Sequence, residues 1–389
     1  MEIYYFILIY SFFVFLNLNS VSINKNYDLE RNNIYYFFTF MIILIIGLNG
    51  NNDEYTRLYL RAPTLGEIFY EGQYWDILYK NIFIESGILF VSVISFLKSI
   101  QLSSQSVFFV YVSVSILFIS LFYKKFSRYY MIAILIYLSH SVISRELSGI
   151  RDGFIGCMTL FMIYYSANNR KNDFYLIYAI SILHHFLSFL AIIIRFLNFK
   201  INRKYVISAI LIAYIFYLLR VPTHFFGLLN YLNILPSIIS NYIYGSSYAY
   251  DLGLFHPKTI QQAFTILLIA LFHSKNKFFN NEDRYFNLIF NSYLLGTIFL
   301  IVFSEYAIFA TRFNSLFLIC EPICITYLII LLHNKKILSY LVIICAILLG
   351  IYNYVFSGKI DNYKFLVNWE KENIKHNYYI IDRNQSIPY

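Results

Sequence analysis

Charged residues are scarce in this sequence. Asp, Glu, Lys and Arg make up 13% of the 389 residues, whereas hydrophobic residues make up 59%. A soluble globular protein carries about a quarter charged residues, so this composition excludes an ordinary water-soluble protein. Apolar runs recur along the whole chain, and a bilayer core of ~30 Å is crossed by roughly 20 residues of helix. We therefore predict an all-α, polytopic integral membrane protein.

Cysteine is also rare, with four residues, and all four lie in apolar segments. This excludes a disulfide framework. Cys320 and Cys324 lie one helical turn apart, and we expect them to be small buried apolar side chains rather than metal ligands. The first residues lack a basic segment and an Ala-x-Ala site, so they are predicted to form a span and not a cleaved signal. No internal repeat is evident, which argues against inverted-repeat transporters.

The net charge of +9 comes from short basic loops between apolar runs. This distribution is typical of topology determinants that face the cytoplasm and does not indicate nucleic-acid binding. We predict about ten spans with long extracytoplasmic loops, and a surface tail at 357–389 after a membrane domain at 1–356. The spans are predicted at 3–18, 34–49, 105–123, 129–144, 153–166, 205–220, 261–273, 285–303, 312–332 and 337–356.

Two further apolar stretches, 82–97 and 174–194, are ambiguous. All basic loops face the cytoplasm only if neither stretch crosses fully, which predicts two re-entrant or broken helical elements. Irregular backbone at membrane depth is tolerated where protein or a wet site covers it, so these elements predict an enclosed polar site. Two additional full spans are the alternative.

Three arginines are not explained by topology. Arg145, Arg151 and Arg312 are predicted at outer span ends, and acids lie nearby in sequence at Glu146, Asp152 and Glu305. Charge on this side of the membrane suggests function, and the planar guanidinium suits a diphosphate through paired hydrogen bonds. Arg151 also begins a predicted helix, whose free N–H groups favour anions. Structural salt bridges between helix ends are the alternative.

Imidazoles and carboxylates are the other candidates for chemistry. His184 and His185 lie midway along 174–194, where a buried imidazole needs partners; either could accept a proton or donate a hydrogen bond. Asp53 follows the second span and Glu85 precedes the first ambiguous stretch. Such carboxylates could act as a general base or form a solvated surface. His140 is predicted to lie at a membrane interface.

The order of these residues resembles the EpsG-like and O-antigen (Wzy-type) polysaccharide polymerases. The resemblance covers roughly 34–330. Two departures concern the site: Asp152 stands where the family often has Gln, and His184 precedes the matching histidine, so the equivalent imidazole stays open. The residues that carry the resemblance are, in order, Asp53 and Tyr55; Glu85, Gly87, Leu89 and Phe90; Ile150, Arg151 and Gly153; Arg170 and Lys171; His185 and Ser188; Arg312, Phe313 and Pro322.

The resemblance implies a glycosyltransferase-type polymerase in the inner membrane of a bacterium. It implies transfer of a growing glycan from undecaprenyl diphosphate to a lipid-linked repeat unit at the outer face, without metal or other cofactor. A chain-length regulator protein is a candidate partner. Arg151, Arg312, His185 or His184, and Asp53 or Glu85 are the implied catalytic set; Arg145, Tyr55, Asp152 and Glu305 are the implied substrate-binding set. A lipid-linked glycan flippase and a membrane O-acyltransferase are the alternatives.

Overall fold

The computed structural model describes residues 3–20, 27–48, 62, 87–147, 149–200, 202–232, 240, 243, 250–273, 283–332 and 335–356. Throughout these ranges the regular structure is helical, which confirms the predicted all-α class. The tail at 357–389 and most of the long segment between the second span and Gly87 lie outside them. The predicted domain boundary at 356/357 therefore stays a prediction.

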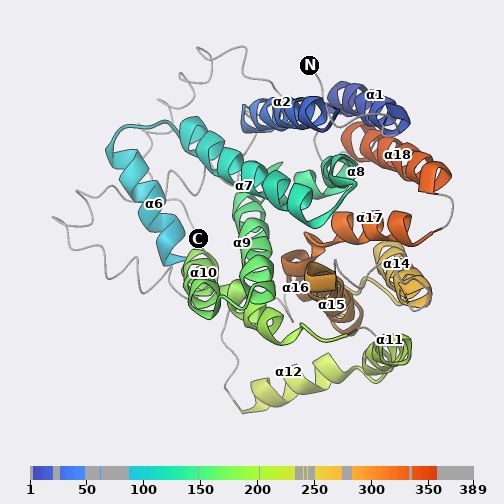
Figure 1. Ribbon diagram of the computed structural model, residues 1–389. Coiled ribbons are helices and arrows are strands. Elements are labelled where there is room, and N and C mark those ends of the chain that lie inside the picture. Colours follow the sequence, from blue (N-terminus) through green and yellow to red (C-terminus); the bar gives the residue numbers. More distant parts are fainter. Residues whose placement is uncertain are drawn as a thin grey trace.

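Helices occur where the apolar runs predict them (Figure 1). They are α1 (Ile3–Ser20), α2 (Tyr27–Gly47), α6 (Ile88–Ser99), α7 (Ser104–Phe126), α8 (Tyr130–Ile136) with its π-helical continuations η1 (Tyr137–Ser141) and η2 (Ile143–Leu147), α9 (Ile150–Ala167), α10 (Lys171–His184), the 3-10 helix η3 (Phe186–Phe196), α11 (Arg203–Leu218), α12 (Val221–Tyr231), α14 (Pro257–His273), α15 (Asp283–Val302), α16 (Ala307–Leu318), α17 (Glu321–Leu331) and α18 (Lys335–Ile351) with η5 (Tyr352–Phe356).

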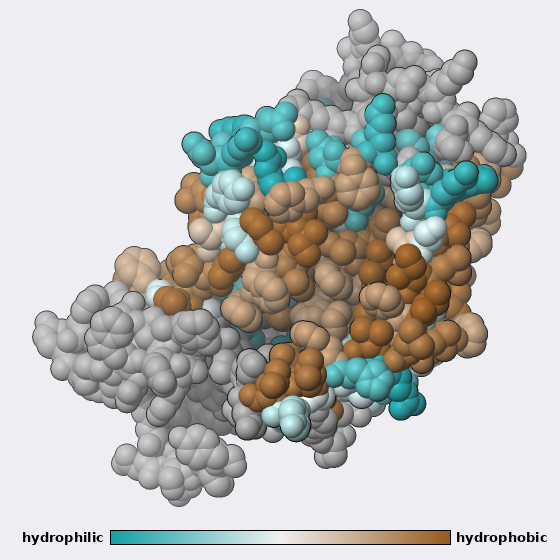
Figure 2. Space-filling model, turned by 90° about the horizontal axis from the view of Figure 1, so that it is seen from below, coloured by the Kyte–Doolittle hydropathy of each residue, from teal (hydrophilic) through white to brown (hydrophobic). Residues whose placement is uncertain are grey.

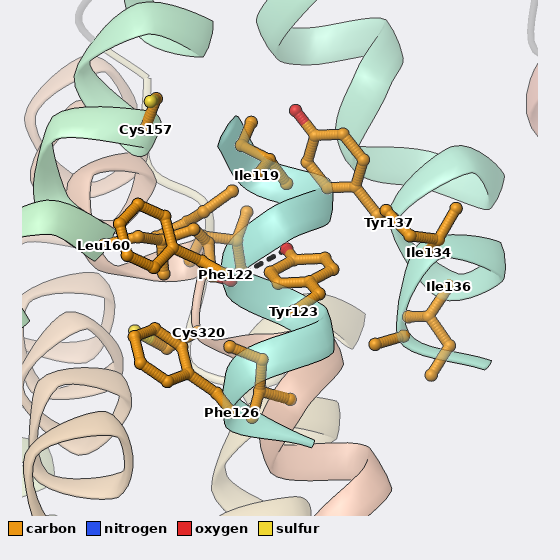
Figure 3. Packing of buried hydrophobic residues seen from close by; sticks show 14 of the residues in the cluster. Ile119, Phe122, Tyr123, Phe126, Ile134, Ile136, Tyr137, Cys157, Leu160 and Cys320 are labelled. Carbon is orange, nitrogen blue, oxygen red and sulfur yellow. Dashed lines mark hydrogen bonds between the residues drawn. The ribbon is translucent and has the colours of Figure 1, made fainter. Parts of the chain in front are cut away.

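Long helices pack side by side around a shared apolar core. α7 lies between α2 and α9, α9 also packs against α10 and α16, and α15 packs against both α11 and α16. At the centre, Phe122 and Phe126 of α7 point toward Leu160 of α9 and Cys320, whereas the ring of Tyr123 lies on the side of Tyr137 (Figure 3). The Tyr123 hydroxyl donates a hydrogen bond of 2.9 Å to the carbonyl oxygen of Ile319. Aromatic side chains thus fill most of the space between the central helices.

The outer surface of the bundle is strongly apolar. Large hydrophobic side chains are exposed on several helices, for example Phe12 of α1, Leu211 of α11 and Leu348 of α18, which is 62% exposed. Figure 2 shows hydrophobic residues across the middle of one face and hydrophilic residues gathered at its edges. A soluble monomer rarely exposes so much apolar area. The chain is therefore a helical membrane protein.

The predicted count of ten spans is not confirmed. Within the described ranges, three helices are long and apolar enough to cross a membrane, or up to five if each bent pair is one span. α7 is one of the three. The others lie at Tyr285–Val302 and Lys336–Tyr354.

Two spans that were predicted as single helices are bent pairs instead. The stretch at 312–332 consists of α16 and α17, with a bend of 58°, and the span predicted at 205–220 continues through a bend of 54° into α12. At the first bend Pro322 lies in the opening turn of α17, where its missing N–H and fixed φ suit a helix start. At the second, Arg220 has a left-handed backbone (φ +51°) and caps α12, which also begins with a proline in its first turn.

Candidate functional site

The stretch 174–194 forms a helical hairpin. α10 ends at His184, His185 has an extended backbone (φ −156°, ψ 122°), and η3 begins at Phe186. The Tyr178 hydroxyl donates a hydrogen bond of 3.1 Å to the carbonyl oxygen of Phe189 on the other arm. The two residues lie about equally far from the turn, because a 3-10 helix rises further per residue. The arms are therefore antiparallel, and His184 and His185 form what we call the hairpin tip.

His184 is enclosed by rings. Its imidazole centroid lies 4.2 Å from the ring of Phe154 in α9, 5.1 Å from Phe90 in α6 and 5.6 Å from Tyr111 in α7. Nε2 is buried and has no hydrogen-bond partner among the residues that the structure describes. A buried nitrogen without a hydrogen-bond partner costs free energy. The site therefore suits a ligand or a water molecule that forms a hydrogen bond with Nε2.

α6 begins directly at the hairpin tip. Its N-terminal cap is Gly87, with a positive φ of +65°, and a Cβ at this position would overlap the carbonyl oxygen of His184. Only glycine allows both this backbone conformation and this approach. The free N–H groups in the first turn of α6 therefore lie near the two imidazoles. A break at the hairpin tip and a short helix from Ile88 agree with two broken or re-entrant elements; their depth in a membrane stays a prediction.

Two of the predicted arginines lie within electrostatic range of the hairpin tip. The Arg151 guanidinium lies 5.8 Å from the ring centroid of Phe90, and its charge acts on both His184 and His185. Arg312, exposed on α16, also acts electrostatically on His185. Thus α9 and α16, which are far apart in sequence, each carry one arginine whose charge acts on His185.

The partners of His185 define its hydrogen-bonding role. Its Nδ1 accepts a hydrogen bond of 3.1 Å from the backbone N–H of Leu187. A nitrogen that accepts carries no proton, so the neutral ring has its proton on Nε2. His185 therefore presents an N–H donor at Nε2. Such a donor suits an oxyanion as its partner, whereas it cannot accept a proton from a hydroxyl group.

Arg145 lies elsewhere than the sequence suggests. It is 1% exposed, and its Nη1 donates to the carbonyl oxygen of Asp152 at 3.0 Å while its Nη2 donates to that of Ser315. These carbonyls follow Arg151 by one residue and Arg312 by three. Arg145 consequently ties the first turn of α9 to α16, and it touches the site through backbone. Asp152 contributes its carbonyl to this tie.

Glu305 forms an ion pair with an arginine other than Arg312. Its Oε1 lies 3.5 Å from Nε of Arg220, and its Oε2 accepts a hydrogen bond of 2.7 Å from Thr223. It thereby holds the bend between α11 and α12. Asp53, Tyr55 and Glu85 lie outside the residues that the structure describes, so their predicted roles stay predictions.

One buried polar cluster was missed by the sequence analysis. Glu321, at the start of α17, is 1% exposed and contacts His140 of η1, Tyr293 of α15 and Gln261 of α14. The predicted interfacial position of His140 stays a prediction, and the structure adds that this histidine bonds to a buried carboxylate. The available signal was Glu321 itself, an acid within a predicted span.

Metal ligands are not grouped in the part of the chain that the structure describes, where no three His, Cys, Asp or Glu side chains come together. Cys157, Cys320 and Cys324 are buried free thiols. The predicted lack of a metal stays a prediction.

The fold and the hairpin tip together define a helical membrane protein with an internal cationic and imidazole site. The chain belongs to the EpsG family, whose model matches residues 32–368. This confirms the family that the sequence resembles. The chain is also 23% identical over 347 residues to the amylovoran biosynthesis protein AmsC of Erwinia amylovora, across 85% of this chain and 87% of that protein. No solved structure matches it.

Proposed function

We propose that this protein polymerises lipid-linked oligosaccharide repeat units at the outer face of a bacterial inner membrane. Membership of the EpsG family and similarity to a protein named for amylovoran biosynthesis support a role in polysaccharide assembly. The observation that carries the proposal is that Arg151 and Arg312 both lie within electrostatic range of His185 at the hairpin tip. Two guanidinium groups and an N–H donor suit a polyprenyl diphosphate, whose charge increases as it leaves.

The reaction transfers the growing glycan from its lipid diphosphate to a hydroxyl of the next lipid-linked unit. Arg151 and Arg312 bind the diphosphate oxygens, with the Nε2–H of His185 as a further donor. The first turn of α6 adds N–H groups that favour negative charge. Leaving-group stabilisation by fixed donors is a large part of catalysis when the charge develops away from water.

The remaining predicted residues have supporting roles in this proposal. Arg145 is a positioning residue, because it fixes α9 to α16 and so sets the spacing of the two diphosphate-binding arginines. Asp53 or Glu85 orients the acceptor hydroxyl, and Tyr55 binds sugar. A chain-length regulator protein is a candidate partner within the membrane.

The test uses Arg151→Ala and Arg312→Ala in a strain that lacks the gene. We expect each to lower the yield of long polymer by on the order of 100-fold, as removal of one transition-state donor does. The corresponding Lys variants should restore little, because one ammonium cannot replace a bidentate guanidinium. Arg203→Ala, exposed at the start of α11, is the matched control and should leave the yield unchanged.

The amount of each variant in the membrane is measured in parallel. Normal long polymer from both alanine variants would refute the diphosphate site. Accumulation of single repeat units on the cytoplasmic side of the deletion strain would instead indicate a flippase. Polymer of normal length that lacks an acyl group would indicate an acyltransferase.

A further inference from the structure

Outside the hairpin tip, Glu321 and His140 form a closely bonded pair of ionisable side chains, of which the carboxylate is buried. Nε2 of His140 lies 2.9 Å from Oε2 of Glu321. The carboxylate is 1% exposed and the imidazole 19%. Oε1 of the same carboxylate accepts hydrogen bonds from the Tyr293 hydroxyl at 3.1 Å and from the Gln261 amide at 3.3 Å.

The contacts require this pair to share one proton. Nδ1 of His140 lies 3.1 Å from the carbonyl oxygen of Ile136, and a carbonyl can only accept, so Nδ1 carries a proton. The contact between Nε2 and Oε2 then needs a second proton, because two bare acceptors would repel. The pair is therefore either imidazolium with carboxylate or imidazole with carboxylic acid. The two further donors on Oε1 of Glu321, Tyr293 and Gln261, favour the carboxylate form.

The pair lies at two irregular points of the backbone. His140 belongs to the π-helical turn η1, and such turns are frequent at functional sites. Glu321 is the first residue of α17, immediately after the 58° bend. The two polar groups of the pair thus meet where both helices depart from regular α-helical geometry.

One turn of α14 links the pair to the helix that carries Arg312. Gln261 donates to Glu321, while its neighbour Gln262 exchanges hydrogen bonds with Asn314, two residues after Arg312. Thr297 of α15 donates both to Gln262 and to the carbonyl oxygen of Tyr293. Hydrogen bonds through Gln261 and Gln262 thus connect the pair to Asn314, on the helix that carries Arg312.

We propose that His140 and Glu321 form an acid–base pair that takes up the proton released in the transfer reaction. This inference rests on the proposed function. When the acceptor attacks, its O–H bond and the bond from the anomeric carbon to the diphosphate oxygen break, and a new C–O bond forms. The diphosphate keeps the bonding electrons. Glu321 receives the proton, and His140, which is 19% exposed, releases one to water, which returns the pair to its single shared proton.

Several neighbouring groups set the charge around the pair. Lys258 of α14 acts on Glu321 from the predicted outer side, and Tyr293 and Cys324 face the carboxylate from α15 and α17. Tyr123 of α7 lies within electrostatic range, and the Ser141 hydroxyl is 3.3 Å from Nε2 of His140. Among these groups, only His140 forms with Glu321 a contact in which either partner can hold the proton.

Glu321→Gln separates an acid–base role from a structural one. A glutamine keeps the shape, accepts from Tyr293 and Gln261, and can donate its amide N–H to Nε2 of a neutral His140. Every hydrogen bond is kept, but the proton that Glu321 and His140 share is lost. An acid–base role predicts normal protein in the membrane and a drop in long polymer on the order of 100-fold, the scale of general acid–base catalysis. A structural role predicts normal polymer, since a neutral replacement for a buried ion pair is often tolerated.

Thr297→Val is the matched control, because it removes a neutral hydrogen bond of the same network and should leave the polymer unchanged. Infrared spectroscopy of the purified protein provides a test that does not depend on the reaction. We expect a protonated-carboxyl band that grows on acidification and is absent from Glu321→Gln. If the spectra of the unmodified protein and of Glu321→Gln do not differ, the proposal that Glu321 shares a proton with His140 is wrong. If the band is present but Arg151→Ala and Glu321→Gln both make normal polymer, the proposed function fails and the proton site stands.

Discussion

At Gly87 the backbone has a φ of +65°, and the residue lies against the carbonyl of His184. A side chain here meets two obstacles, the left-handed backbone and the backbone of the hairpin tip. The first costs an L-residue roughly 1–2 kcal/mol. The second cannot be relieved by a rotamer change, because the neighbouring atom belongs to the main chain. The residue therefore fixes how closely α6 approaches the two histidines.

We predict that Gly87→Ala moves α6 away from the hairpin tip and lowers both polymer yield and melting temperature. Gly227→Ala in α12 is the control, since no atom lies within 4 Å of the added Cβ. In a helix interior this control should stabilise by about 0.5–1 kcal/mol. The comparison is made on detergent-purified proteins and on polymer from complemented cells. Equal behaviour of the two alanine variants would show that the close approach at Gly87 is dispensable.

At the scale of helices, the bend between α16 and α17 depends on a contact from α7. The Tyr123 hydroxyl donates to the carbonyl of Ile319, at the point where the helical hydrogen bonding is interrupted (Figure 3). We predict that Tyr123→Phe destabilises the purified protein by about 1–3 kcal/mol, because a buried carbonyl loses its donor. Tyr36→Phe, which removes an exposed hydroxyl bonded to Lys124, should change the melting temperature little. A similar loss in both variants would contradict a special role for this bend.

The sequence predicts most of the helices, and the structure shows why it could not predict more. Arg151 and Arg312 could be grouped because both were assigned to outer span ends. The burial of Arg145 could not be foreseen, since its partner carbonyl at Ser315 is 170 residues away. The same holds for His140 and Glu321, which are separated by 181 residues. Hydropathy also contains no information on the direction of a helix axis. The stretch 312–332 is one continuous apolar run in the sequence, so its bend could not be predicted.

For the whole molecule, function depends on which side of the membrane the hairpin tip faces. Basic residues flank several helix ends, among them Lys124 and Lys125 at the end of α7 and Lys171 at the start of α10. The positive-inside rule assigns these ends to the cytoplasm. The N-terminal ends of α9 and α16 then face outward, with Arg151 in the first turn of α9 and Arg312 in the second turn of α16. This orientation is what the proposed polymerisation at the outer face requires.

Single cysteines can test this orientation in a Cys345→Ser background, which removes the exposed native thiol. Phe255→Cys and Lys171→Cys are both at exposed positions, the first before α14 and the second at the start of α10. We expect a membrane-impermeant maleimide to label position 255 in intact spheroplasts and position 171 only after permeabilisation. The reverse pattern would place both arginines on the cytoplasmic side, where the lipid-linked units are built rather than joined. The acid–base pair and the helix bends would be unaffected by that outcome, because they depend on packing within the bundle and not on its orientation.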